Sequence, residues 1–300
     1  MKGFSRVRVP GVKNIVTVCS AKGGVGKSTT TVNVALALKN TGFRVGIVDA
    51  DITGPSIPKM MGVEQSQVET YRVAAVDRFV PPVNYGVKVM SMGLIVPHDE
   101  AIAVRGPMLN KYVRALLFQT DWEELDYLMV DMPPGTNDVH LTVTQEVCLT
   151  AAVIVSTPQE VALIDVRRGI DMFTAVNVPI LGLVENMSYF VCNKCDERHY
   201  LFGKNGVKIT AANLNVPFLG EIPFVAKILA DMDIGAPPAL RGDPTLESAA
   251  PYYALAAKID AGLVALKNKA KEPKIVFDSS CFGNFDKYII AYISCSLLVV

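Results

Sequence analysis

The fold is decided by residues 15–30, which read IVTVCSAKGGVGKSTT. A run rich in β-branched residues ends at small residues, passes through three glycines and opens into a periodic segment at 31–39. The order strand, glycine-rich loop, helix is typical of a phosphate-binding loop, whose backbone N–H groups turn toward phosphate oxygens. In such a loop Lys27 reaches the β- and γ-phosphates and the Ser28 hydroxyl binds Mg²⁺. The predicted ATP contacts in the loop are Gly23, Gly24, Val25, Gly26, Lys27, Ser28 and Thr29.

The loop departs from the strict P-loop motif. Ala21 stands where that motif has glycine, and a second lysine, Lys22, directly precedes the glycine pair. KGGVGKST resembles the deviant Walker A signature of the ParA/MinD class of ATPases. This resemblance implies a catalytic role for Lys22, which would reach across a dimer interface to the partner's nucleotide. A glycine-rich turn without a ligand would need both lysines and the Ser-Thr pair to coincide by chance.

Three aspartates fall at the ends of predicted parallel strands, where ligands bind in an open α/β sheet. Asp131 closes an apolar run and is predicted to hold Mg²⁺, directly or through water. Asp51 is predicted to orient the attacking water, and Asp49 to support Mg²⁺ indirectly or to serve the structure. A lone aspartate at a strand end is usually a helix cap or a solvated group, so these roles depend on the phosphate-binding loop. Asn186 closes another strand and is predicted to bind adenine through its amide, although alone it would be a turn residue.

Strand and helix patterns alternate along most of the chain. The predicted strands are 43–49, 87–92, 127–131, 151–156, 180–184 and 218–222, and the predicted helices after the first are 106–119, 158–176, 204–213 and 246–268. Residues 64–84 are predicted to form a surface excursion. The alternation predicts an α/β fold, a doubly wound and mostly parallel sheet in a P-loop NTPase of the deviant Walker A type.

The domain organisation follows from where this pattern begins and stops. Residues 1–10 are a basic lead, and 11–270 form the P-loop ATPase domain with a cysteine-bearing loop at 189–203. Residues 271–300 break the pattern and are predicted to be an atypical tail. Its apolar end, 288–300, is too short to span a bilayer as a helix, so no stable membrane span is expected.

Charge and cysteine content exclude two classes of protein. Lysine plus arginine equals aspartate plus glutamate, 29 each, so no nucleic-acid partner is expected. The six cysteines do not resemble a secreted disulfide framework. Cys19 and Cys148 lie in or beside apolar runs and are interpreted as buried thiols, whereas Cys281 and Cys295 belong to the tail.

Cys192 and Cys195 form the one C-x-x-C pair of the chain. A tetrahedral zinc site or an iron–sulfur cluster needs four ligands, and a two-fold dimer would bring two such pairs together. Thiolates bind zinc and iron–sulfur clusters equally well, so the cysteine pair does not indicate which of the two is bound. A redox-active dithiol and a chance pair of surface cysteines are the other interpretations. His199 could add a ligand, but a solvated loop histidine is the preferred interpretation.

From residue 11 to about 240 the chain resembles the Mrp/NUBPL family of iron–sulfur carrier ATPases, in particular its mitochondrial branch that serves complex I assembly. The matching stretches are GVKNIVTVCSAKGGVGKST, VDADITGPSIPKMMG, YLMVDMPPGTNDVHL, AVIVSTPQEVALIDVRRGIDMF, VPILGLVENMSYFVCNKC and VPFLGEIP. The chain departs from the family at Asn137, where glycine is usual, and from about residue 275 onward.

The resemblance implies a slow ATPase that uses Mg²⁺ and works as a homodimer. A labile 4Fe–4S cluster would bridge Cys192 and Cys195 of the two subunits and be delivered to apo iron–sulfur proteins, with complex I subunits as recipients. The implied compartment is the mitochondrial matrix, although no presequence is visible, and the alternative is the cytoplasm.

Two other functions compete with the carrier. A MinD/ParA-like positioning ATPase with a zinc-stapled dimer would want a basic amphipathic helix, for which Lys258, Lys267, Lys269 and Lys271 give feeble support. A reductase like the nitrogenase iron protein would take its cluster ligands from separate loops rather than from one C-x-x-C.

Overall fold

The structure, a computed structural model, describes residues 6–96, 106–136 and 138–271. The chain forms two compact units, residues 1–264 and 265–300. The first contains the sheet and every predicted site residue, and the described part of the second is the end of the last helix. Residues 272–300 of the predicted tail, with both of its cysteines, lie outside the described residues, as does the departure at Asn137.

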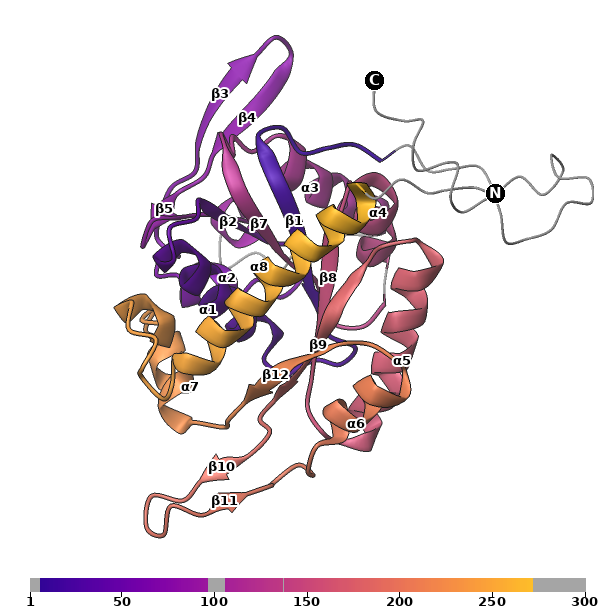
Figure 1. Cartoon of the computed structure of the whole chain (residues 1–300). Helices are drawn as coiled ribbons and strands as arrows, with labels where there is room; N and C mark the ends of the chain where they lie inside the picture. Colours follow the sequence, from indigo (N-terminus) through magenta and orange to yellow (C-terminus); the bar gives the residue numbers. More distant parts are fainter. Residues whose placement is uncertain (1–5, 97–105, 137, 272–300) are drawn as a thin grey trace, which may run out of the picture. The chain divides into compact units, whose positions relative to one another are not determined.

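An eight-stranded sheet runs through the first unit (Figure 1). Its strands are β1 (Val12–Cys19), β2 (Val45–Asp49), β5 (Val83–Asn84), β6 (Val87–Ser91), β7 (Leu125–Asp131), β8 (Ala151–Ser156), β9 (Ile180–Asn186) and β12 (Phe218–Ile222). Their order across the sheet is β12-β9-β8-β1-β7-β2-β6-β5, and only the β5–β6 pair is antiparallel. The predicted mostly parallel α/β sheet is therefore confirmed.

Helices cover both faces of this sheet. They are α1 (Lys27–Asn40), α2 (Ile57–Met60), α3 (Gly106–Phe118), α4 (Asp138–Glu146), α5 (Glu160–Ala175), α6 (Gly206–Asn213), α7 (Ala226–Asp233) and α8 (Ala250–Lys271), with 3₁₀ turns at Met92–Leu94 and Pro238–Arg241. On one face α3, α4 and α5 contribute Val113, Val139 and Phe173 to a single apolar cluster with the strands. Figure 1 shows α1 and the start of α8 on the other face, where Asn40 donates a 2.9 Å hydrogen bond to Tyr253 Oη. The fold is thus doubly wound, as predicted.

Burial on both faces explains the sequence of the central strands. All six residues of β8, AAVIVS, are buried. A strand covered by helices on both sides has no solvent face, so its sequence is a continuous apolar run instead of an alternating one. A continuous apolar run of this kind therefore predicts a buried parallel strand.

The strand register brings distant polar residues to one edge of the sheet. Asp49 at the end of β2 pairs with Asp131 at the end of β7, and Val18 of β1 pairs with the same aspartate. The phosphate-binding loop therefore begins at the same edge of the sheet at which the strands carrying Asp49 and Asp131 end.

Two small hairpins extend from the sheet. One consists of β3 (Glu69–Val73) and β4 (Val76–Val80) and lies within the predicted surface excursion. The other consists of β10 (Phe190–Val191) and β11 (Arg198–His199) and carries the cysteine pair. No helix among the described residues is long and apolar enough to cross a membrane.

Candidate functional site

The glycine-rich loop connects β1 to α1 and has the backbone geometry of a phosphate cradle. Gly24 and Gly26 adopt left-handed conformations, with φ of +77° and +82°. Gly26 is the N-cap of α1, and no side chain caps that helix or places an acid in its first turn. The N–H groups at this end of α1 can therefore serve an anion.

Beside the cradle, the side chains of Lys27, Ser28, Thr31 and Asp131 form a compact polar cluster. Lys27 Nζ lies 2.5 Å and Ser28 Oγ 2.6 Å from Asp131 Oδ2. Thr31 Oγ1 donates to the other carboxylate oxygen at 2.7 Å. The carboxylate of Asp131 is fully buried and is held by these contacts. A hydroxyl and a carboxylate side by side are oxygen ligands that suit Mg²⁺, so the residues present fit the ion that accompanies ATP.

Asp49 is a buried carboxylate that organises the chain after β2. Its oxygens accept hydrogen bonds from the backbone N–H groups of Asp51, Ser56 and Ile57 at 3.0–3.2 Å. Burial, and then the negative charge of Asp131, raise the pKa of Asp49 to about 7. These contacts favour the structural role over the indirect Mg²⁺ role among the two that the sequence left open.

Asp51 differs from Asp49 because it faces the cavity beside the loop. Its side chain is partly exposed and accepts a hydrogen bond from Thr53 Oγ1 at 3.3 Å. Burial raises the pKa of Asp51, and the positive charge of Lys27 opposes that effect. A partly desolvated carboxylate near phosphate groups is able to accept a hydrogen bond from water.

The cavity itself has a volume of about 320 Å³ and contacts the loop along residues 23–29. Its lining also includes Asp51, Asn186 and Phe224. Asn186 Nδ2 donates to the backbone oxygen of Val25 at 2.7 Å, so one donor of the predicted adenine contact already supports the loop. The adenine role of Asn186 stays a prediction.

Lys22 is the one predicted site residue of the loop that does not line this cavity. It is exposed, and within the described part of the chain it has no ion pair. Its backbone oxygen accepts a hydrogen bond from Ser20 Oγ at 3.0 Å, which fixes the main chain beneath it. An exposed lysine on a fixed loop is suited to contact a second molecule.

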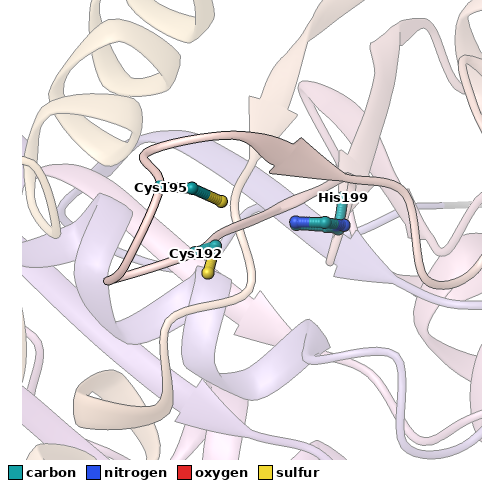
Figure 2. Close-up of side chains that lie close together, drawn as sticks. All are labelled: Cys192, Cys195 and His199. Carbon is teal, nitrogen blue, oxygen red and sulfur yellow. The ribbon is translucent and has the colours of Figure 1, made fainter.

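The cysteine pair lies at the tip of the β10–β11 hairpin, which begins four residues after the end of β9. Cys192 N donates to Glu197 O at 3.0 Å, and Asp196 N donates to Cys192 O at 2.8 Å, which closes the turn. The thiols of Cys192 and Cys195 and the imidazole of His199 lie together, with their ligand atoms within 4.8 Å of one another (Figure 2). Backbone N–H groups of the turn lower the pKa of Cys192 by hydrogen bonding. The hairpin thus presents potential metal ligands to solvent.

Contacts at the base of the hairpin attach it to the body of the protein. The Arg198 guanidinium lies 4.2 Å from the ring centroid of Tyr189 and 3.8 Å from the carboxylate of Glu221 on β12. Phe224 N donates to Tyr189 O at 2.7 Å. Phe224 also lines the cavity beside the glycine-rich loop, so one residue contacts both that cavity and the base of the hairpin.

Two residues of this hairpin, His199 and Arg198, were not among the predicted site residues. His199 is exposed to solvent, as predicted, but it lies in strand β11, paired with Phe190, and its imidazole lies near the thiols. The spacing C-x₂-C-x₃-H would have been the signal. Arg198 had no such signal, because its partners are known only once the sheet is built. Of the other thiols, Cys19 is buried, which raises its pKa to about 12, and Cys148 is half-buried.

Residues 11–260 match a protein-family model described as "NUBPL iron-transfer P-loop NTPase", within the ParA group. The chain is 46% identical over 276 residues to the iron-sulfur cluster transfer protein NUBPL of Dictyostelium discoideum, covering 91% of this chain and 84% of that protein. It is 46% identical over 264 residues to an Arabidopsis thaliana protein named "Iron-sulfur protein required for NADH dehydrogenase, mitochondrial", covering 88% and 83%. Among solved structures, a nucleotide-binding protein from Archaeoglobus fulgidus in complex with ADP has a TM-score of 0.68 and 37% identity, covering 78% of this chain and 90% of that one.

Proposed function

Since this chain belongs to the NUBPL family of iron-transfer P-loop NTPases, we propose that it is an ATP-dependent carrier of iron–sulfur clusters. Two subunits would hold one labile 4Fe–4S cluster, the cargo, between their Cys192 and Cys195 pairs. The observation that carries the proposal is the exposed C-x-x-C hairpin on a nucleotide-binding fold. Two thiolates are half of the usual ligand set of a cluster, so a two-fold dimer completes it.

The nucleotide site supports hydrolysis of Mg·ATP. Lys27 would neutralise charge on the β- and γ-phosphates, while Ser28 and Asp131 would hold the metal ion. Asp51 would orient the attacking water, and Lys22 of one subunit would contact the γ-phosphate bound to the other. Hydrolysis would then change the dimer interface on which the cargo depends.

The recipients and the compartment are proposed from the Arabidopsis relative, whose name ties it to mitochondrial NADH dehydrogenase. We expect the loaded carrier to deliver its cluster to apo subunits of that enzyme in the mitochondrial matrix. The expected result is faster transfer to an apo 4Fe–4S subunit of NADH dehydrogenase than to an unrelated apo-ferredoxin. Equal transfer rates would refute the proposed recipients and would indicate a general carrier. For such a carrier the cytoplasm is an equally suitable compartment.

Anaerobic reconstitution with iron and sulfide tests the carrier function itself. Uptake should saturate at about one 4Fe–4S per dimer, and changing Cys192 or Cys195 to serine should abolish the chromophore. Cys148→Ser is the matched control, since that thiol is outside the hairpin. A chelator or an apo acceptor should remove the cluster because the hairpin is exposed. Stoichiometric zinc without iron uptake would refute the carrier function, and a cluster that resists removal would indicate a reductase.

A further inference from the structure

The cysteine hairpin offers three potential ligands within one subunit, where a bridging cluster uses two. We propose that Cys192, Cys195 and His199 form a single-subunit site for one divalent transition-metal ion of the Zn²⁺ or Fe²⁺ kind. The inference deepens the proposed function, because the same thiolates would otherwise hold the cluster. The imidazole is the addition that makes such a mononuclear site possible.

The side chains come together for a reason that lies in the backbone. Phe190 and His199 are directly paired across the hairpin, so their side chains share one face of it. Cys192 follows two residues after Phe190 and returns to that face, because side chains alternate along an extended chain. In Figure 2 the imidazole points across the hairpin toward the thiols. The proximity therefore follows from strand pairing as well as from the side-chain conformations.

The distances suit a tetrahedral ion after a small adjustment. Metal bonds of about 2.3 Å to sulfur and about 2.0 Å to nitrogen place ligand atoms roughly 3.5–3.8 Å apart at a tetrahedral angle. The three ligand atoms already lie within 4.8 Å of one another. Cys195 and His199 are exposed, so their side chains can rotate inward without disturbing the core. Three protein ligands leave a fourth position for water or for an incoming ligand.

Such a site would compete with the cargo. An ion held by both thiolates of a subunit occupies the ligands that a bridging cluster needs, so a metal-loaded subunit and a cluster-loaded dimer exclude each other. Binding would also release the thiol protons, since thiolates are the ligating form. The hairpin would then have two alternative occupants: a single metal ion in one subunit, or a cluster that bridges two subunits.

Cobalt tests the site in the full chain, because Co²⁺ substitutes for Zn²⁺ and reports its geometry in the visible spectrum. Reduced protein is titrated anaerobically while light scattering follows its mass. We expect one Co²⁺ per monomeric chain, with tetrahedral d–d bands, a sulfur-to-cobalt charge-transfer band and a paramagnetically shifted imidazole N–H resonance. The chain has three histidines, so the variant His199→Ala assigns that resonance.

In His199→Ala the shifted resonance should vanish and Co²⁺ affinity should fall by about 100-fold or more, because losing a direct ligand costs at least as much as the roughly 10- to 100-fold that losing an outer-shell partner of a ligand costs. Glu197→Gln is the matched control on the same hairpin and should bind like wild type. The site is refuted if His199→Ala keeps its affinity within about 3-fold, or if wild type binds one Co²⁺ per two chains. Wild type that binds Co²⁺ through three ligands but takes up no cluster would instead refute the proposed function alone.

Discussion

At the scale of single residues, the two loop lysines have different surroundings and should have separable roles. Lys27 is 7% exposed and contacts Asp131, whereas Lys22 is exposed. Lys27→Ala should weaken ATP binding by about 10- to 100-fold, the effect of losing a charged hydrogen-bond partner. Lys22→Ala should leave binding nearly intact and slow hydrolysis by about 100-fold or more, if it stabilises charge on the partner's nucleotide. Nucleotide titration and phosphate release measure the two effects, and unchanged hydrolysis in Lys22→Ala would rule out its action in trans.

Asp51 and Asp131 should also separate, since one faces the cavity and the other is buried among its partners. Asp51→Asn should retain Mg·ATP and slow its cleavage by about 100-fold or more, because only the water-orienting charge is lost. Asp131→Asn should weaken the dependence of ATP binding and hydrolysis on Mg²⁺. It should also destabilise the fold by about 3–5 kcal/mol, since it leaves the Lys27 ammonium without its buried counter-charge. Mg²⁺ titration and urea unfolding compare them. Identical behaviour of the two variants would show that this division of roles is wrong.

His140 of α4 should make the fold sensitive to acid. It is buried, and burial lowers its pKa to about 4. The unfolded chain has the ordinary value of 6.5, so its imidazole binds a proton more readily below that pH. The contribution of His140 to stability is therefore complete above about pH 6.5 and is lost toward pH 4, by up to about 3 kcal/mol. Urea unfolding of wild type and His140→Gln across this range should show a smaller pH slope in the variant, and equal slopes would contradict the assignment.

At the scale of elements, the sequence predicted what local pattern determines. β8 and β12 have the bounds that their apolar runs indicated, at Ala151–Ser156 and Phe218–Ile222. Helix α4, Asp138–Glu146, was not predicted, because its valines and threonines have low helix propensity and packing on the sheet stabilises it instead. The strands β10 and β11, with two residues each, are too short to show an alternating pattern. Their pairing brings His199 to the thiols, so this part of the site needed the structure.

The loop and strand β9 should be energetically coupled through Asn186. A Cβ atom added at Gly26 would lie 2.1 Å from Asn186 Nδ2, whereas one added at Gly24 meets nothing within 4 Å. Both glycines have left-handed φ, so alanine should cost about 1–2 kcal/mol at each. Gly26→Ala should cost about 1 kcal/mol more, since it also displaces the hydrogen bond from Asn186 to the loop.

Urea unfolding of both glycine variants, with and without Asn186→Ala, measures this coupling. In the Asn186→Ala background the excess cost of Gly26→Ala should disappear, because the side chain that obstructs it is gone. Gly24→Ala serves as the matched control and should cost the same in both backgrounds. An excess that persists without Asn186 would show that the loop is strained for another reason.

At the scale of the whole molecule, the nucleotide and the cargo are proposed to use the same edge of the sheet. The phosphate-binding loop follows β1, and the cysteine hairpin follows β9, whose last residue contacts that loop. The alternation of strands and helices predicted this edge, because parallel strands all end on one side. Five residues separate Asn186 from Cys192 along the chain. The sequence could not show that Asn186 also contacts the phosphate-binding loop, which makes this short segment a path between the two sites. Two ligands that both favour a dimer through this edge should bind cooperatively.

The last prediction is therefore a linkage between ATP and the cluster. In Asp51→Asn, where Mg·ATP should persist uncleaved, the cluster should resist a chelator better with nucleotide than without it. Cluster-loaded protein should in turn bind ATP more tightly by the same factor, since coupling between two sites is reciprocal at equilibrium, and factors of about 5–150 are typical. Equilibrium chelator competition and nucleotide titration, each with and without the other ligand, measure the two factors. Lys22→Ala should reduce both, because its contact across the interface would carry part of the coupling. Two factors near one would show that the sites act independently, even though they share an edge.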